Sequence, residues 1–232
     1  MSDPAAAPVD PPSDRRLDAR LDARVASGSA APADLDRFAL AERMVHKVFG
    51  ILMAVCILTA VILYNGSIMI AVGHRHFVEQ IHVWCGLALP VPLLLGLASK
   101  AFRSDARRLN RFTPADWRWL RSKTRRDGTI RVGKFNAGQK VNAWLVLGST
   151  AVLVGTGSTM YWTGLVRLSW RSGATFVHDW FALGLGLLVL GHIGFAVTDP
   201  EARRGMRTGR VSARWARTEH RAWAEENDEP AP

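Results

Sequence analysis

Four long apolar stretches dominate the pattern of hydrophobic and polar residues along the chain. Lys, Arg, Asp and Glu are absent from residues 48–74, 80–99, 141–166 and 180–198. The hydrocarbon core of a bilayer requires about 18 or more consecutive apolar residues in a helix. In lipid each backbone group must be paired within the segment, which favours helices over strands. The pattern therefore predicts an all-α integral membrane four-helix bundle, with membrane helices over residues 44–64, 81–99, 141–163 and 175–198.

The segments outside these helices differ from them in composition. Residues 1–36 are rich in Ala, Pro, Asp and Arg and contain no apolar stretch, which is typical of a disordered extension and not of a secretory signal. We therefore expect a disordered N-terminal extension over residues 1–36, a transmembrane domain over 37–200, and a basic-then-acidic cytoplasmic tail over 201–232. Within the second helix, Pro90 and Pro92 predict a bend, because proline lacks the backbone N–H that a helix needs.

The basic residues predict the orientation of the chain. Of the 30 Lys and Arg residues that give a net charge of +10, six precede the first predicted helix, one lies in the first connection, thirteen in the second, two in the third and seven in the tail. Positive charge stays on the cytoplasmic side, so both termini are expected to be cytoplasmic in a multi-pass protein of the cell inner (plasma) membrane. Topology and attraction to anionic membrane lipid account for the charge, and no nucleic acid partner is needed.

Four of the seven histidines fall within or beside the membrane helices at two depths. The second and fourth helices both start on the outer side, so His82 and His178 are expected near the outer face. His192 follows His178 by 14 positions, which is about 21 Å along a helix and about 40° around it. His192 is thus expected near the inner side, at the level of His46.

Two pairs of imidazoles from different helices suit two haems. Ionisable residues in a membrane are costly and usually functional, and a low-spin haem iron takes one imidazole on each side of the porphyrin plane. The chain has no Cys-x-x-Cys-His motif, so the haems would be b-type and not covalently attached. Cys56 and Cys85 both lie in apolar stretches, which excludes a disulfide framework and a cysteine-based metal site. The predicted axial ligands of the haem iron are His46, His82, His178 and His192.

Two other classes of protein stay open at this point. In a haemless membrane anchor or assembly subunit the histidines would be structural, since a single membrane histidine is more often hydrogen-bonded than a ligand. In a small transporter they would relay protons, but the chain shows no inverted repeat. His74 and His76, in an outer loop, are expected to be solvated, and His220, in the tail, is excluded as an axial ligand.

Three stretches of the sequence resemble a known family. The first is Lys-Phe-Asn-Ala-Gly-Gln-Lys at residues 134–140, the second is the His178 and His192 spacing, and the third is the tail from Met206 to Trp223. The family pattern in that tail comprises Gly209, Val211, Ser212, Trp215, Ala216, His220 and Trp223. From about Phe38 to Glu226 the chain is similar to the gamma subunit of membrane-bound respiratory formate dehydrogenase, a di-haem cytochrome b of the group that includes the nickel–iron hydrogenase cytochrome b.

The resemblance implies a function and a set of site residues. His46 and His192 would hold the inner haem, His82 and His178 the outer one, and Asn136, Gly138 and Gln139 would form a menaquinone site with His192. Electrons would come from a periplasm-facing iron–sulfur subunit and its catalytic oxidoreductase subunit. The chain would be a quinone-reducing electron-transfer subunit without the site of the primary substrate, and a hydrogenase or another molybdenum enzyme stays open as the alternative partner.

Three details of this assignment have alternatives. The motif at residues 136–139 also fits a plain helix start, and Lys140 also fits an anchor for lipid phosphate. Asp179, directly after a predicted axial histidine, departs from the family pattern. It would either orient an imidazole or face the outer headgroups.

Overall fold

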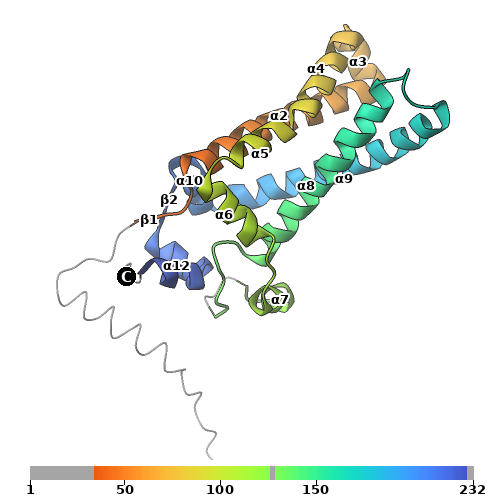
Figure 1. Cartoon of the computed structure of the whole chain (residues 1–232). Helices are drawn as coiled ribbons and strands as arrows, with labels where there is room; N and C mark the ends of the chain where they lie inside the picture. The colour runs from red at the N-terminus through yellow and green to blue at the C-terminus, as the bar shows by residue number, and fades with distance from the viewer. Residues whose placement is uncertain (1–33, 126–128, 229–232) are drawn as a thin grey trace, which may run out of the picture.

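Four apolar helices form the body of the molecule (Figure 1). The computed structural model describes residues 34–125 and 129–228, so most of the predicted disordered extension lies outside the described residues. The spanning helices are α2 (Leu40–Tyr64), α4 followed by α5 (Arg75–Ala88 and Pro90–Gly96), α8 (Ala137–Tyr161) and α9 (Leu168–Thr198). The predicted membrane bundle is confirmed. Each helix begins before its predicted start, at 40, 75, 137 and 168, because polar and charged residues continue the helix beyond the apolar stretch.

The second spanning helix is interrupted at Leu89. Pro90 cannot donate the backbone hydrogen bond that would continue α4, and Leu89 N–H instead donates to Gly86 O at 3.2 Å, the spacing of a tighter turn. The helix resumes as α5 with Pro90 in its first turn. The helix is therefore interrupted at the prolines where a bend was predicted.

The spanning helices pack in two antiparallel pairs. α2 packs along α4, α8 packs along α9, and α4 contacts α8 between the pairs. The small core at the middle of the bundle contains Met53 and Cys56 of α2, Leu89 and Leu185. Large apolar side chains on the outer surface stay exposed, among them Leu58, Leu147 and Leu190, as expected for helices surrounded by lipid.

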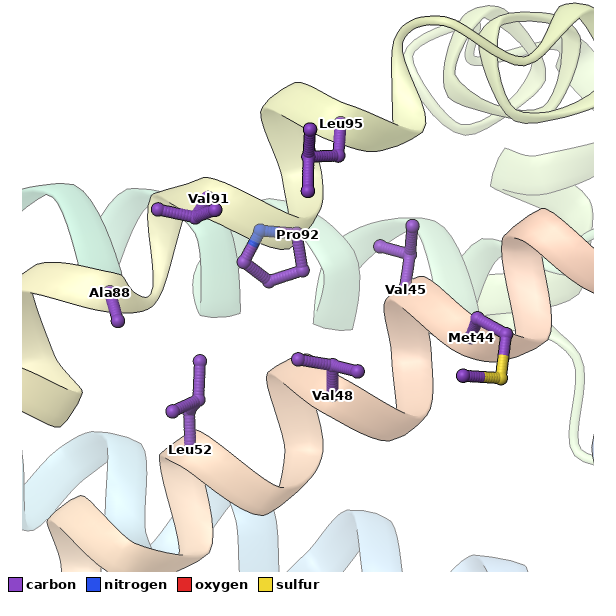
Figure 2. Close-up of a pocket in the computed structure, with 8 residues that line it drawn as sticks. All are labelled: Met44, Val45, Val48, Leu52, Ala88, Val91, Pro92 and Leu95. Carbon is purple, nitrogen blue, oxygen red and sulfur yellow. The ribbon is translucent and has the colours of Figure 1, made fainter.

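A shallow apolar groove separates α2 from α5 (Figure 2). It has a volume of about 370 Å³ and is lined by Met44, Val45, Val48, Leu52, Ala88, Val91, Pro92 and Leu95. Val48 lies two residues after His46, which is about 200° around the helix. The groove therefore faces away from His46, toward lipid.

The two ends of the bundle differ. The loop end carries α3 (Gly66–Val72) and the connection between α8 and α9. The other end, which we call the terminal end, carries the start of α2, the start of α8 and the end of α9. The long connection between α5 and α8 contributes two further helices there, α6 (Lys100–Leu109) and α7 (Pro114–Arg121).

The chain ends form a folded cap on the terminal end, which we define as residues 34–38 and 200–228. It consists of α10 (Pro200–Thr208), α11 (Ala213–Glu219), α12 (Arg221–Asp228), and a two-stranded antiparallel sheet of β1 (Asp34–Asp36) and β2 (Arg210–Ser212). Leu35 lies opposite Val211 in the sheet. The expectation of disorder over residues 1–36 is therefore wrong for Asp34–Asp36, because these residues find a strand partner far along the chain.

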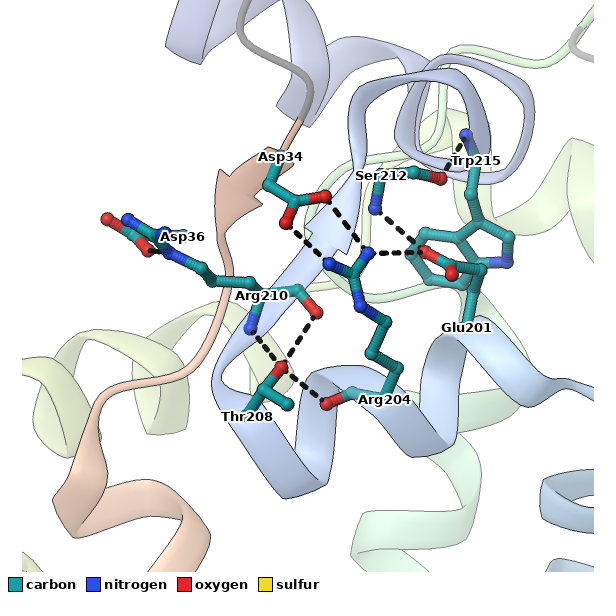
Figure 3. Close-up of polar contacts among 8 residues, drawn as sticks. All are labelled: Asp34, Asp36, Glu201, Arg204, Thr208, Arg210, Ser212 and Trp215. Carbon is teal, nitrogen blue, oxygen red and sulfur yellow. Dashed lines mark hydrogen bonds and ion pairs between the residues drawn. The ribbon is translucent and has the colours of Figure 1, made fainter.

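Ion pairs fasten the sheet to α10 (Figure 3). Arg204 donates to both carboxylate oxygens of Asp34, and Ser212 N–H donates to Glu201 at 2.8 Å. The hydrogen bonds from Arg204 lower the pKa of Asp34 below its ordinary value of 3.8. This contact therefore stabilises the fold above pH 3.8 and is lost as the pH falls through the lowered pKa.

Candidate haem-binding site

Two histidine pairs face each other across the bundle. His82 of α4 and His178 of α9 have ring centroids 6.3 Å apart, and His46 of α2 and His192 of α9 have ring centroids 6.1 Å apart. The structure thus brings the four predicted ligands together in the predicted combinations. Because His178 and His192 are 14 residues apart on one continuous helix, the two pairs are separated by about 21 Å along its axis.

The spacing within each pair matches what one haem iron requires. An imidazole nitrogen bonds a metal at about 2 Å and lies about 1.1 Å from the centre of its own ring, so two rings on opposite sides of one iron have centres about 6.2 Å apart. The observed separations of 6.1 and 6.3 Å agree with this value. The rings of the two pairs are inclined to each other by 53° and 67°.

A threonine hydroxyl sets the tautomer of each histidine in the pair of His82 and His178. Thr59 Oγ1 lies 2.9 Å from His82 Nδ1, and Thr156 Oγ1 lies 2.9 Å from His178 Nδ1. Each hydroxyl donates its one hydrogen to a backbone carbonyl of its own helix, at Val55 for Thr59 (2.7 Å) and at Val152 for Thr156 (2.7 Å).

This arrangement leaves one ring nitrogen of each histidine free to bind a metal. A hydroxyl that has used its hydrogen can only accept, so Nδ1–H of His82 and of His178 must be the donor. Nε2 of both rings is then unprotonated. Such outer hydrogen bonds fix ring orientation and raise the basicity of the ligand.

Glycines leave space beside the histidines on two helices. Gly50 follows His46 by four residues and Gly86 follows His82 by four, so each lies on the same helix face one turn away. A Cβ built at either glycine would meet no heavy atom within 4 Å. A flat ring system held by the histidine can therefore approach the helix backbone closely at these turns.

The predicted quinone-binding residues form the start of α8. Asn136 is the N-cap residue, and its Oδ1 accepts from Gln139 N–H at 2.9 Å, while Gln139 Oε1 accepts from Asn136 N–H at 3.0 Å. This reciprocal pair is a capping box. It occupies both amide oxygens and leaves both NH₂ groups able to donate to a carbonyl oxygen of a ligand.

Neighbouring residues hold this helix start rigidly. A Cβ on Gly138 would approach the Trp119 ring of α7 to 2.9 Å, so α7 packs directly on the backbone there. Lys140 is buried and its Nζ lies 2.7 Å from Asp116 Oδ2 and 2.9 Å from Arg111 O. The interpretation of Lys140 as an anchor for lipid phosphate is therefore wrong.

The remaining histidines lie away from the two pairs. His74 and His76 are exposed at the loop end, as expected of solvated residues. His220 is buried in the cap, where its Nδ1 contacts Gly133 O at 2.7 Å and its Nε2 contacts Arg37 at 3.0 Å. Asp179 is exposed. The group that lies within hydrogen-bond distance of His178 Nδ1 is the Thr156 hydroxyl.

Sequence reasoning missed Thr59 and Thr156. A signal exists in hindsight: each is a threonine inside an apolar helix, where a hydroxyl bonds its own backbone and can accept one further hydrogen bond. Which histidine approaches the hydroxyl depends on how the helices pack, and the sequence gives no indication of that.

Comparison with known proteins agrees with this geometry. Residues 37–209, well over half of the chain, match the family described as prokaryotic cytochrome b561. The chain is also similar to the cytochrome b556(Fdn) subunit of nitrate-inducible formate dehydrogenase from Escherichia coli K12, Escherichia coli O157:H7 and Shigella flexneri. Each is 31% identical over 98 residues, covering 41% of this chain and 45% of the relative. The alignment thus spans less than half the length of these curated relatives.

The family match fixes the class of protein and the type of cofactor. Its members carry b-type haem, and the four spanning helices of this chain present histidine pairs at the spacing that such a group needs. The chain therefore belongs to the prokaryotic cytochrome b561 family and is a membrane cytochrome b of electron transfer.

Proposed function

We propose that this chain is the cytochrome b subunit of a respiratory oxidoreductase similar to formate dehydrogenase, and that it passes electrons through two b haems to menaquinone. The observation that carries the proposal is the pair of imidazole separations, 6.1 and 6.3 Å, at two depths of one bundle. His46 and His192 hold one haem, and His82 and His178 hold the other. Bound haem supplies a one-electron carrier at each level.

The side chains around each haem favour electron transfer over binding of oxygen. Each haem would be held by two histidines, a ligand set that supplies electron transfer and not oxygen binding. Thr59 and Thr156 hold the rings of the outer pair in one tautomer. Because these groups are fixed by the helices, they need little rearrangement when the charge of the centre changes.

The terminal end is the proposed site of quinone reduction. Asn136 and Gln139 present amide donors there, at the start of α8, and His192 lies near the same end of α9. The excess of Lys and Arg in the termini and in the second connection supports a cytoplasmic location of this end. Protons would then be taken up from the cytoplasm.

The proposed donor is a periplasm-facing iron–sulfur subunit that belongs to a catalytic oxidoreductase. The similarity to formate dehydrogenase cytochrome subunits supports this kind of partner. In that arrangement electrons enter at the His82 and His178 pair and leave at the His46 and His192 pair. Oxidation on one side and proton uptake on the other would generate a membrane potential.

Haem stoichiometry in histidine variants tests the proposal. The purified wild-type chain is expected to bind two haems, measured from the reduced-minus-oxidised Soret and alpha bands. His82→Ala or His178→Ala should remove one centre, and His46→Ala or His192→Ala the other, together with quinone reduction. His76→Ala, at an exposed histidine of the loop end, is the matched control and should keep both. If all four variants retained both spectral signals, the assignment of ligands would be wrong.

A further inference from the structure

Two buried carboxyl groups share one buried ammonium at the terminal end. Lys134 Nζ lies 2.7 Å from Asp105 Oδ1 and 2.6 Å from Asp105 Oδ2, and 3.8 Å from Glu42 Oε1. The side chains of Glu42, Asp105 and Lys134 are 8%, 9% and 11% exposed. They come from α2, from α6 and from the segment that leads into α8, so the cluster joins three parts of the chain.

One carboxylate oxygen in this cluster has no hydrogen-bond donor. One carboxylate oxygen of Glu42, Oε2, accepts from Ala39 N–H at 2.6 Å. The other, Oε1, is buried without a hydrogen-bond partner, and the carboxyl groups of Glu42 and Asp105 both approach the Lys134 ammonium. Two carboxylates cannot donate to each other, so a hydrogen bond between them forms only when one of them carries a proton.

The balance of charge in the cluster also favours a bound proton. A single ammonium neutralises one of the two carboxylates, and burial disfavours the charge that is left over. Arg37 acts on Asp105 through space, but its charge also acts on Asp199 and Glu219. Arg43, next to Glu42 in the chain, directs its guanidinium to Arg207 O at 2.7 Å. The geometry thus favours a proton held between Glu42 and Asp105.

The cluster adjoins both functional segments of the terminal end. Glu42 precedes His46 by four residues on α2, which places it one turn away on the same face. Lys134 precedes Asn136 by two residues. A proton on Glu42 is therefore held between the helix of one haem ligand and the start of α8.

We propose that Glu42, loaded through Asp105 and Lys134, passes protons from water to the quinone at this end of the bundle. The proposal rests on the proposed function, which supplies the electrons. Conversion of one quinone to its quinol takes two electrons and two protons. For each proton the O–H bond of the Glu42 carboxyl breaks as an O–H bond forms on a quinone oxygen, and the carboxylate then regains a proton that enters from water past Asp105.

A purely structural ion-pair network would look different. It would be expected to match its charges and to satisfy its oxygens, because an unpaired buried charge is strongly destabilising. Lys140 and Asp116, a few residues away, show this matched form, with one cation on one carboxylate. The extra carboxyl at Glu42 is what distinguishes the first cluster from the second.

The test follows haem reoxidation in the full chain, in lipid nanodiscs with haem bound. The haems are reduced with dithionite, excess reductant is removed, and the naphthoquinone menadione is added in a stopped-flow instrument across a range of pH. The wild-type rate is expected to fall as the pH rises, because the donor loses its proton. Glu42→Gln keeps the shape and the helix cap but carries no acidic proton, so its rate should fall about 100-fold at neutral pH and become nearly independent of pH.

Two further variants separate a proton-transfer role from a structural one. Asp105→Asn removes one of the two carboxylates, so Glu42 becomes the single carboxylate that the Lys134 ammonium neutralises. Glu42 should then lose its proton more easily, and the rate should begin to decline at a lower pH than in the wild type. Glu79→Gln, at an exposed glutamate of the loop end, is the matched control and should leave the profile unchanged. In the reduced-minus-oxidised infrared spectrum, the protonated-carboxyl band should be absent from Glu42→Gln at every pH and unchanged in Glu79→Gln, and in Asp105→Asn it should disappear at a lower pH than in the wild type.

Each outcome decides the matter. A Glu42→Gln profile identical to the wild type, with both haems bound, overturns the relay and leaves the proposed function intact. If Glu42→Gln loses haem, Asp105→Asn decides: a shifted profile supports the relay, and an unshifted one shows that the cluster is structural. A wild-type chain that binds haem but is not reoxidised by menadione overturns the proposed function, and the relay with it.

Discussion

At the scale of single residues, hydrogen bonds distinguish His82 and His178, as proposed haem ligands, from ordinary buried imidazoles. Thr59 and Thr156 each accept a hydrogen bond at 2.9 Å, from Nδ1–H of His82 and of His178 respectively. Each threonine does so because its own hydrogen is used by the helix backbone. A neutral imidazole with Nε2 unprotonated is the form that binds iron, so the two hydroxyls would prepare both proposed ligands for haem.

Replacement of either threonine tests this preparation. Thr59→Val and Thr156→Val keep the volume but remove the acceptor, so haem should be lost about 10 to 100 times more readily from the proposed site of His82 and His178. The measurement is transfer of haem to apomyoglobin, followed in the Soret band. Thr150→Val is the matched control, because Thr150 is buried and bonds only its own helix, at Val146 O. Equal rates for all three variants would contradict the role of the hydroxyls.

At the scale of elements, the start of α8 combines a structural and a chemical role. The capping box between Asn136 and Gln139 is what begins the helix, and the same side chains retain the donors that a quinone requires. The interpretation as a plain helix start, which the sequence left open, is therefore correct as a description of the fold. It does not compete with the proposed quinone site, because different atoms of each amide are used.

A single substitution distinguishes the two roles. Serine caps helices about as well as asparagine, so Asn136→Ser should keep α8, both haems and the melting temperature. It removes the NH₂ group and should slow quinone reduction while the haem spectra stay unchanged. The check is menadione-driven reoxidation of the reduced protein. An unaltered rate would show that Asn136 serves only as a cap.

The pair between α7 and α8 supports this helix start from outside. Lys140 and Asp116 are 6% and 5% exposed and lie 2.7 Å apart. Lys140→Met leaves the Asp116 carboxylate buried without its cation, at a cost of about 3–5 kcal/mol. We expect a lower melting temperature in detergent, and a recovery of much of that loss in the double variant with Asp116→Leu. A single variant as stable as the wild type would show that the pair contributes little.

At the scale of the whole molecule, one arginine links the two ends of the chain. Arg37 lies over the rings of Trp215 and Trp223, with its Cζ 4.7 and 5.2 Å from their centroids, and donates to Lys134 O at 2.7 Å. Burial lowers the pKa of the Arg37 guanidinium to about 9.

Conservative replacement of this arginine should loosen the cap alone. Arg37→Lys keeps a cation but loses the planar guanidinium, which lies over the tryptophan rings and donates hydrogen bonds at the same time. We expect a cost of about 3 kcal/mol. Trypsin should then cut within residues 200–227 faster than in the wild type, while both haem signals are retained. Arg214→Lys, at an exposed position of α11, should not change the cleavage rate. A protected cap in Arg37→Lys would contradict a central role for Arg37.

The sequence by itself determined what depends on distance along the chain. Apolar length fixed the four spanning helices, and the 14-residue interval fixed the depths of His178 and His192, because a helix has a constant rise per residue. Motifs shared with the family added the prediction of a quinone site at the start of α8. None of these inferences needs to know which helix packs on which.

Only the tertiary structure decided what depends on contacts between distant segments. It placed Thr59 against His82 and Thr156 against His178, paired Asp34–Asp36 with Arg210–Ser212, and set Lys134 between Glu42 and Asp105. Such pairings arise from the packing of helices and strands whose partners are far apart in sequence. A hydroxyl, an acid or a short strand carries no local signal of the partner it will meet.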